Sequence, residues 1–573
     1  MNTDTIDQLA GGEVPPWAAG TQGRDQELFP VLNATEIGLL LPYGEVQEYS
    51  KNSFVWRAGD PSAFFLILEG AIDVTRSGTD DYQVIATHTT GQYLGEINSI
   101  SGANALVNGI AVEPVRVLHL DADNIRRVIA TESDLGEKIL LSFILRRMRL
   151  IANGFGNVAL IGDSTSPDTA ELHRFLSRNG VPFDALNPGK DQEAIEKRLA
   201  QCKVDTQQWP LVIADVEVLI QPSIRAVAEY LGLSSVVNCS QVFDVAIIGS
   251  GPGGMAAAVY AASEGLSVLV LESCAPGGQA GSSSKIENYM GFPTGISGQA
   301  LMGRGYLQAQ KFGAQIAVAR KLDSLECGKA LHTLRLDDHE SVTARTVVIA
   351  TGAVYRQPAI DGLDRFGSVH YGASHVESEL CAGQEVTIIG GGNSAGQAAV
   401  YLAKRSRKVH ILIRSANLTH SMSDYLIQRI ERLPNITLHP NTEVKAINGD
   451  QRMQSLSIRN NQNEQTVELP TSHLFIFIGA RPGTDFANRD LALDDNGFVV
   501  TGSMLSTEQL QASQWHLDRA PFPLETSYPR VFAVGDVRSG SVKRVASAVG
   551  EGSVCVQLIH QALYELEDSV AND

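Results

Sequence analysis

The stretch FDVAIIGSGPGGMAAAVYAASEGLSVLVLESCAPGGQAG, residues 243–281, decides the fold of the central part of this chain. An apolar run over residues 242–248 predicts a buried strand, and Gly249-x-Gly251-x-x-Gly254 follows it directly. Small apolar residues then recur at helical spacing, and a second apolar run ends on Glu272. This pattern predicts a dinucleotide-binding site, because it consists of a strand, a glycine turn, a helix and a second strand that ends on an acid. In such a site, Glu272 is expected to accept a hydrogen bond from a ribose 2′-hydroxyl.

Each residue of the glycine turn has a physical role in this prediction. Gly249 forms the tight turn, Gly251 lets the backbone approach a pyrophosphate, and Gly254 lets the helix pack on the strand. Pro252 and Gly253 begin the helix, whose free N–H groups and partial positive charge favour phosphate. These five residues are therefore expected to bind the cofactor.

Composition limits the classes of function. The 573-residue chain has a net charge of −19 and 43 % hydrophobic residues, which is typical of globular material in about four domains. It has no basic run for nucleic acid and no run of about 18 apolar residues for a membrane span. Residues 1–14 lack the features of a secretory signal. The six cysteines are Cys202, Cys239, Cys274, Cys327, Cys381 and Cys555. No two of them form a CxxC pair, which predicts a reducing, cytoplasmic compartment and no metal site.

The residues after the first glycines carry a resemblance to a known family. Gly277-Gly278-Gln279, Ile286-Glu287-Asn288 and Gly291-Phe292-Pro293 follow in order. In residue type and spacing, the chain from Gln241 onward resembles low-molecular-weight thioredoxin reductases. The resemblance implies an FAD-dependent NAD(P)H oxidoreductase that forms a homodimer. Beyond the first turn, the FAD contacts that it implies are Gly278, Gln279, Asn288, Thr351, Gly352, Gly535, Asp536, Arg544, Val545 and Ala546.

A second fingerprint predicts the nicotinamide site. Residues 386–389 lead into Gly390-x-Gly392-x-x-Ala395, again a strand, a turn and a helix, and the expected NADP contacts of this turn are Gly390, Gly392, Asn393, Ser394 and Ala395. The next apolar run, VHILIR, ends on Arg414, where an NAD site favours an acid and an arginine suits the 2′-phosphate of NADP. Ser415 and Thr419 stand where relatives carry further arginines, so NAD remains possible. The alternative for Arg414 is a solvated charge at a strand end.

The redox cysteines of the family are missing. The CATC motif of thioredoxin reductases corresponds to residues 373–376, ASHV, so Ala373 and Val376 replace both thiols. His375 is a candidate catalytic residue that could relay a proton, although a surface histidine is the alternative. Cys381, on a predicted helix, is expected to pack in a core rather than to act as a redox centre.

Electrons are therefore expected to reach an external acceptor, which is a quinone, dioxygen or a substrate on a partner. A reductase of an external dithiol protein is one alternative. A redox or ligand sensor that uses the flavin and the N-terminal domains is another.

The N-terminal part predicts a β-barrel or jelly roll, because short apolar runs alternate with turn residues over residues 29–119. Ala58-Gly59-Asp60 and Gly95-Glu96-Ile97 resemble a cyclic-nucleotide-binding domain. That family's phosphate-binding Arg-Ala pair corresponds to Ala105-Leu106, so no arginine is available to pair with a buried phosphate. A ligand-free docking module is expected, with a cyclic-nucleotide sensor as the alternative.

The following segment resembles the glutaredoxin/thioredoxin fold. Its apolar run NVALIG is followed by a predicted helix and then by Val181-Pro182-Phe183. A charged predicted helix comes next, and it precedes Trp209-Pro210. The redox CPYC of that family aligns with Ser166-Pro167-Asp168-Thr169, and hydroxyls cannot carry thiolate chemistry. A spacer or docking platform is therefore expected.

The sequence as a whole predicts a multidomain protein, with a β-barrel or jelly roll, a thioredoxin-like α/β unit and two Rossmann-like α/β domains for FAD and NAD(P). The expected boundaries are a lead-in at 1–26, a cyclic-nucleotide-binding-like domain at 27–151, a thioredoxin-like domain at 154–236, an FAD domain at 240–357 and 481–573, and an NAD(P) domain at 358–480.

Overall fold

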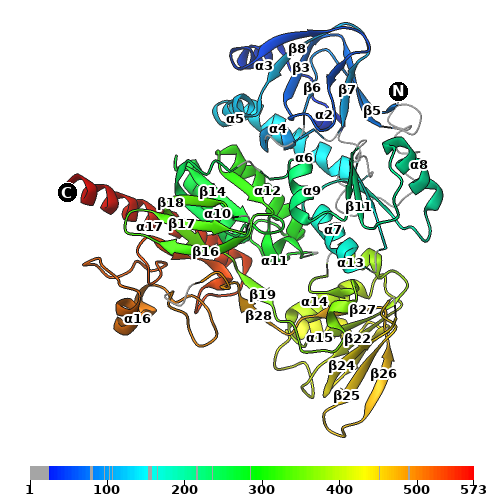
Figure 1. Cartoon of the computed structure of the whole chain (residues 1–573), viewed down its shortest axis with the longest axis vertical. Coiled ribbons are helices and arrows are strands. Elements are labelled where there is room, and N and C mark those ends of the chain that lie inside the picture. The colour runs from blue at the N-terminus through cyan, green and yellow to red at the C-terminus, as the bar shows by residue number, and fades with distance from the viewer. Residues whose placement is uncertain are drawn as a thin grey trace.

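Figure 1 shows the chain as a computed structural model with four units, of which the FAD domain is formed by two segments that flank the NAD(P) domain in the sequence. The β-rich N-terminal domain and the NAD(P) domain lie at opposite ends, and the FAD domain lies between them. The residues that the structure describes are 25–77, 82–95, 97–101, 104–105, 107–152, 158–163, 166–214, 217–234, 237–283, 285–337, 339–373, 375–450, 452–487 and 491–572.

The N-terminal domain contains two four-stranded antiparallel sheets, which confirms the prediction of a β-rich domain. Apolar side chains from both sheets form a common core. One sheet has the order β1 (Glu45–Tyr49), β8 (Val115–Leu120), β3 (Phe64–Glu69) and β6 (Tyr93–Leu94). The other has the order β2 (Phe54–Trp56), β7 (Asn108–Ala111), β4 (Ala71–Ser77) and β5 (Tyr82–Thr89). The helices are α2 (Asp25–Leu28), α3 (Ala34–Leu40), α4 (Ile97–Ser101), α5 (Ala122–Thr131) and α6 (Ser133–Ala152).

The second unit has one four-stranded sheet with helices. Strand β9 (Val158–Ile161) pairs in parallel with β10 (Phe183–Leu186), and β11 (Leu211–Ala214) pairs antiparallel with both β9 and β12 (Glu217–Ile220). The Trp209–Pro210 peptide bond before β11 is cis. Its helices are α7 (Pro167–Arg178), α8 (Gln192–Cys202) and α9 (Ile224–Tyr230).

This second unit is fixed to the FAD domain. Its buried residues belong to one continuous hydrophobic cluster with those of the FAD domain. At the end of α7, Arg178 Nη2 donates to the Gly278 carbonyl at 3.0 Å, and Asn179 Nδ2 donates to the Cys274 carbonyl at 3.2 Å. The two units therefore share a core as well as polar contacts.

The FAD domain is built on a seven-stranded sheet, and the predicted strand over residues 242–248 is its central strand β13 (Val242–Ile248). Helices α10 (Pro252–Ser263) and α17 (Val545–Asn572) pack against each other beside it. The other strands are β14 (Val268–Glu272), β15 (Gln315–Val318), β16 (Leu322–Cys327), β17 (His332–Leu336), β18 (Ser341–Ile349) and β29 (Val531–Ala533). The other helices are α11 (Gly278–Gly281), α12 (Gly298–Lys311) and α16 (Thr507–Ala512).

A two-stranded connection, β19 (Ala353–Tyr355) with β28 (Ala480–Pro482), leads to and from the NAD(P) domain. That domain has a five-stranded parallel sheet in the order β20 (Val369–His370), β27 (His473–Ile476), β21 (Glu385–Ile389), β22 (Lys408–Leu412) and β23 (Ile436–His439). A three-stranded sheet follows, with β24 (Thr442–Asn448), β25 (Ser455–Asn460) and β26 (Thr466–Pro470). The helices are α13 (His375–Leu380), α14 (Asn393–Leu402) and α15 (Asp424–Glu431).

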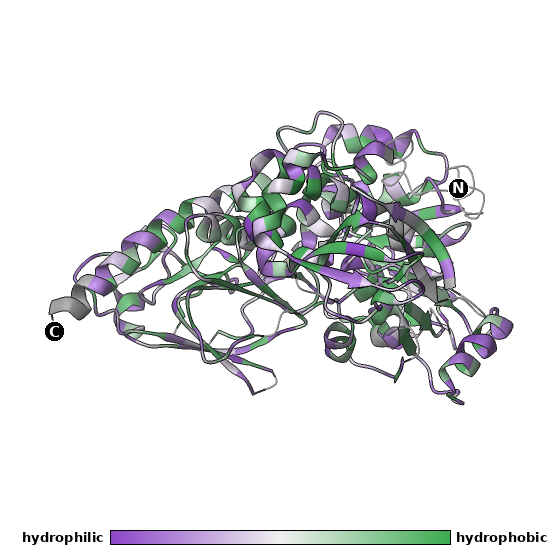
Figure 2. Ribbon diagram, turned by 90° about the horizontal axis from the view of Figure 1, so that it is seen from above, coloured by the Kyte–Doolittle hydropathy of each residue, from purple (hydrophilic) through white to green (hydrophobic). Residues whose placement is uncertain are grey.

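Hydropathy follows this architecture. Figure 2 shows hydrophobic residues gathered on the central helices and strands. Helix α17, which projects toward the C-terminus, carries both hydrophilic and hydrophobic residues. Ion pairs of Arg345 with Glu567 and of Arg519 with Glu565 hold α17 against the FAD domain. Among the described residues, no helix combines the length and the hydropathy that crossing a bilayer requires.

Candidate functional site

The first glycine turn has the predicted shape. Gly249 has φ +98°, a left-handed conformation that favours glycine, and it follows β13 directly. A Cβ added at Gly254 would lie 2.0 Å from the Gly249 carbonyl oxygen, so only glycine permits this contact of helix and strand. Gly251 is the N-cap of α10, and an added Cβ there would meet only the Gly278 Cα at 4.0 Å. The open backbone at Gly251 fits a pyrophosphate at the helix N-terminus.

Glu272 ends β14 beside this turn and is 9 % exposed. Its Oε2 accepts hydrogen bonds from the Ser250 N–H at 3.0 Å and from the Ser250 Oγ at 2.6 Å. Its Oε1 accepts from the Cys274 N–H at 2.9 Å. The carboxylate therefore orders the turn, a role that the sequence pattern did not indicate.

A segment that is distant in the sequence adds a strand to the same sheet. Strand β29 pairs in parallel with β18 and leads into Gly535 and Asp536. Gly535 has φ +73°. Burial raises the pKa of the Asp536 carboxyl, and the charge of Lys543 opposes this shift. Lys543 Nζ also donates to the Asp536 carbonyl at 2.6 Å. Asp536 is thus held beside a cation at the carboxyl end of the strand.

Two residues of α17 that the sequence analysis missed complete this part of the site. Glu551 accepts hydrogen bonds from the Gly535 N–H at 2.7 Å and from Arg538 Nη2 at 2.5 Å. A Cβ added at Gly552 would lie 2.2 Å from the Gly253 carbonyl oxygen, so α17 crosses α10 in backbone contact. The repeated small residues at the start of α17, which begins at Val545 directly after Arg544 and includes Ala546, were a signal for this crossing.

The remaining predicted FAD residues differ in position. Gln279 Nε2 donates to the Ala353 carbonyl, which joins α11 to the connection between domains. Gly352 has φ +64°, and its carbonyl accepts from the Gly483 N–H at 3.1 Å. Thr351 Oγ1 is buried without a hydrogen-bond partner among the described residues. Asn288 is exposed. Gln279, Thr351 and Gly352 thus gather at one junction.

The second glycine turn also has the predicted shape. Gly390 has φ +136°, and an added Cβ would lie 2.2 Å from the Phe477 carbonyl oxygen. Gly392 is the N-cap of α14, where the nearest atom to an added Cβ is 3.9 Å away, while Ala395 is buried in the helix. Asn393 Oδ1 accepts a hydrogen bond from the Ser423 N–H at 2.7 Å, and Ser394 is exposed. This open cradle fits a second pyrophosphate.

Arg414 lies two residues beyond the end of β22 and is exposed. Ser415 Oγ donates to the Asn417 carbonyl at 2.9 Å, and Thr419 Oγ1 donates to Asn417 Oδ1 at 2.7 Å. The hydroxyls that replace the family's arginines therefore stabilise the loop itself.

The segment that corresponds to the lost dithiol lies at the start of α13. Ala373 packs against the core of the NAD(P) domain, whereas Ser374 and the side chains of His375 and Val376 lie outside what the structure describes. The proton-relay role of His375 stays a prediction. Cys381 was predicted within a helix, but it follows the end of α13 because the Gly383 turn ends the helix there. It is fully buried, in agreement with the packing interpretation.

Two open glycine cradles, each between a strand and the helix that follows it, fit two dinucleotides. Residues 243–552 match the family described as pyridine nucleotide-disulphide oxidoreductase, and the chain belongs to this family. Residues 46–132 match the cyclic nucleotide-binding domain.

Within this family, the chain is similar to thioredoxin reductases. It is 30 % identical to thioredoxin reductase of Bacillus subtilis over 338 residues, which are 58 % of this chain and 98 % of that protein. It is 32 % identical to NADPH-dependent thioredoxin reductase 3 of Arabidopsis thaliana over 54 % of this chain and 56 % of that protein. The structure of Lactococcus lactis thioredoxin reductase matches with a TM-score of 0.50 and 29 % identity, over 56 % of this chain and 99 % of that chain. The chain is thus an FAD-dependent NAD(P)H oxidoreductase of the thioredoxin reductase-like kind, and this family uses FAD and NADPH.

Proposed function

We propose that this protein passes electrons from NADPH through FAD to an external acceptor, without a redox-active dithiol of its own. The observation that carries the proposal is that no two of the six cysteines form a CxxC pair. Ala373 and Val376 stand where relatives carry the two cysteines whose disulfide receives electrons from the flavin. FAD, when bound, would accept a hydride from the nicotinamide and hold two electrons.

The surroundings of the cysteines support this proposal. Cys381 lies in the core of the NAD(P) domain, and Cys555 lies in the core of the FAD domain. Burial raises the pKa of both thiols, and it also raises the pKa of Cys274. Because the thiolate is the reactive form in thiol–disulfide exchange, such thiols are poorly suited to form a redox-active disulfide.

The second unit is proposed to be a thioredoxin-like docking platform. Its strand order β10-β9-β11-β12, with one parallel and two antiparallel pairs, supports this assignment. Ser166 stands at the N-cap position of α7, and Thr169 is buried in the first turn, so the two positions that align with the redox cysteines carry hydroxyls, which cannot perform thiolate chemistry. The core that this unit shares with the FAD domain favours a fixed platform over a mobile electron carrier.

The chain's own residues would bind and orient the cofactors. Gly249, Gly251 and Gly254 would receive the FAD pyrophosphate, and Glu272 would bind its ribose. The fingerprint at residues 390–395 would receive the NADP pyrophosphate, with Arg414 at the 2′-phosphate. The family resemblance also implies a homodimer, which sedimentation equilibrium of the full chain tests.

Anaerobic titration of the FAD-loaded chain with NADPH tests the proposal. Reduction should end at two electrons per FAD, and alkylation of the denatured product should count the same number of thiols as before. A thioredoxin reductase with an intact CATC pair provides the control, because its CATC disulfide should take up two further electrons and yield two thiols. Uptake of four electrons per FAD with two new thiols would show a hidden dithiol and overturn the proposal.

A second candidate is reduction of an external disulfide protein, which the names of the relatives favour. In that case oxidised thioredoxin should accelerate NADPH oxidation in proportion to its concentration. A rate that thioredoxin leaves unchanged while a quinone raises it would favour the first candidate.

A further inference from the structure

Three potential metal ligands from separate elements meet in the NAD(P) domain. His370 ends β20, His473 begins the neighbouring strand β27, and Cys381 follows α13. One nitrogen of each histidine and the Cys381 sulfur all lie within 4.8 Å of one another. His370 and Cys381 are 4 % and 0 % exposed. No other such group was found among the described residues.

The two imidazole rings share one hydrogen bond, and one ring nitrogen of His370 has no partner among the described residues. His370 Nε2 lies 2.9 Å from His473 Nδ1, so only one proton can lie between the two nitrogens. The Leu380 carbonyl accepts a hydrogen bond from the His473 ring, which orients that ring as a second-shell carbonyl does in metal sites. His370 Nδ1 is buried and has no hydrogen-bond partner among the described residues.

We propose that His370, Cys381 and His473 bind one thiophilic metal ion, Zn²⁺ or Cu⁺. Imidazole and thiolate are the ligands that these ions prefer. With metal–nitrogen distances of about 2.0–2.1 Å and a tetrahedral angle, the two nitrogens would lie about 3.3 Å apart. The observed 2.9 Å thus requires a shift of only a few tenths of an ångström. Binding forms a metal–sulfur bond and releases the Cys381 thiol proton to solvent.

The position of the cluster gives the ion a structural consequence. Cys381 follows α13, which begins where relatives carry their redox dithiol, and α13 lies beside α7 of the second unit (Figure 1). Glu377 and Glu379 of α13 act electrostatically on His173 of α7. A bound ion would therefore tie α13 to β20 and β27 and fix the side of the NAD(P) domain that faces the second unit. The spacing of the cysteines alone predicted no metal site, because the ligands come from three distant segments.

Metal binding by the full FAD-loaded chain tests the proposal after chelator treatment and dialysis. Zn²⁺, and separately Cu⁺ under anaerobic reducing conditions, are titrated against a competing chromophoric chelator. Co²⁺ serves as a spectroscopic probe for a thiolate ligand. We expect one equivalent of Zn²⁺ or Cu⁺ per chain, with thiolate-to-metal charge transfer in the Co²⁺ form. Absence of stoichiometric binding, or of this band in the parent chain, would overturn the proposal without reference to any variant.

Matched variants identify the ligands. Loss of a second-shell partner weakens metal affinity by about 10–100-fold. Cys381→Ser and His473→Gln each remove a proposed ligand, so each should weaken metal binding by more than this. Cys555→Ser, at another fully buried cysteine, should bind as the parent does. So should His439→Gln, which breaks the equivalent 2.9 Å His410–His439 pair. Retained FAD absorbance reports folding, and His370→Gln replaces any variant that loses it. Equal affinity in the parent and the ligand variants would refute the assignment.

Discussion

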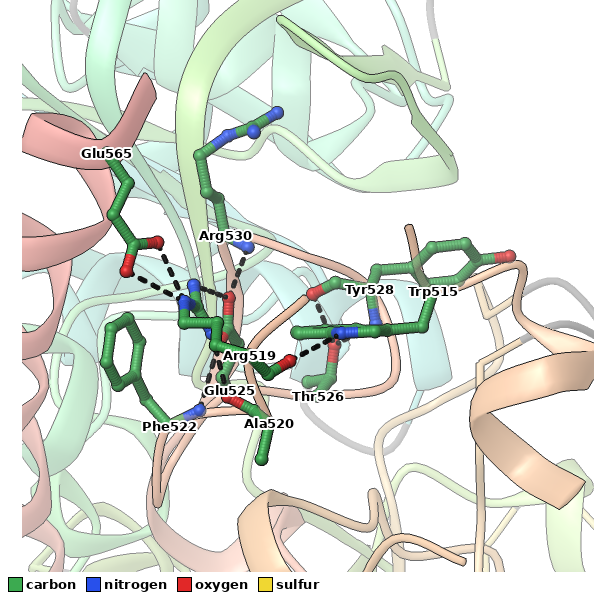
Figure 3. A network of polar contacts seen from close by, with 9 residues as sticks. All are labelled: Trp515, Arg519, Ala520, Phe522, Glu525, Thr526, Tyr528, Arg530 and Glu565. Carbon is green, nitrogen blue, oxygen red and sulfur yellow. Dashed lines mark hydrogen bonds and ion pairs between the residues drawn. The ribbon is translucent and has the colours of Figure 1, made fainter. Parts of the chain in front are cut away.

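Glu525 supplies the sharpest test of how the FAD domain is held together. This carboxylate is fully buried and accepts hydrogen bonds from Arg519 Nη1 at 2.6 Å and Nη2 at 3.2 Å. It also accepts from the N–H groups of Phe522 at 2.9 Å and Arg530 at 2.7 Å (Figure 3). The Glu525 segment pairs with β29, the strand that leads to Gly535. The network therefore supports one wall of the proposed FAD site.

Substitution Glu525→Ala removes all four hydrogen bonds at once. It leaves two backbone N–H groups without their acceptor, and each unsatisfied buried group costs about 1–3 kcal/mol. Breaking a buried ion pair costs about 3–5 kcal/mol, but Arg519 keeps Glu565 as a second partner at 2.7 Å. We therefore expect the free energy of unfolding of the FAD domain to fall by about 3 kcal/mol.

Urea unfolding at a fixed FAD concentration, followed by flavin fluorescence, measures this change. Glu565→Ala is the matched control, because it removes the other partner of Arg519, and its side chain is 42 % exposed. An ion pair of that exposure contributes at most about 1 kcal/mol. If Glu525→Ala lost no more stability than Glu565→Ala, the role given to the buried network would be wrong.

Three further predictions concern the ligand sites. Arg414→Ala should lower kcat/KM for NADPH about tenfold or more, because a charge-assisted hydrogen bond contributes about 1.5–3 kcal/mol. It should leave turnover with NADH unchanged, and equal losses with both cofactors would show that the arginine has a structural role. Gly552→Val should lower FAD retention and cost about 1–3 kcal/mol of stability, because a Cβ would lie 2.2 Å from the Gly253 carbonyl oxygen. Gly550→Val, where nothing lies within 4 Å of an added Cβ, is its control, and equal effects would contradict the explanation. Calorimetric titration with cyclic AMP and cyclic GMP should show no binding, because Ala105 stands at the position of the phosphate-binding arginine; micromolar affinity would refute this.

The glycine turns and their strands could be predicted because their signals are local. A run of apolar residues followed by glycines at fixed spacing determines β13, and the structure places that strand at residues 242–248 as predicted. The second turn at Gly390 follows the same rule. Edge strand β1 (Glu45–Tyr49) was missed because its exposed, polar side chains show no apolar run.

Side-chain encounters between distant segments could not be predicted. Gly552 contacts Gly253, and His473 contacts His370, only because the order of helices and strands brings them together. Hydrophobic periodicity fixes which elements form, but a single sequence carries little information on which two elements become neighbours. The hydrogen bonds of Glu551 to the Gly535 turn were missed for the same reason.

Helix α12 provides a physical link between the N-terminal domain and the proposed FAD site. Helices α4 and α5 of that domain contact α12, and a Cβ added at Gly298, the first residue of α12, would lie 1.7 Å from the Ala280 carbonyl oxygen. Ala280 belongs to α11, the helix that begins at Gly278 beside the glycine turn. A helix of 14 residues spans about 21 Å as one rigid element. A partner of the N-terminal domain could therefore alter FAD binding only if its affinity differs between two positions of α12, and FAD would then change the partner's affinity by the same factor.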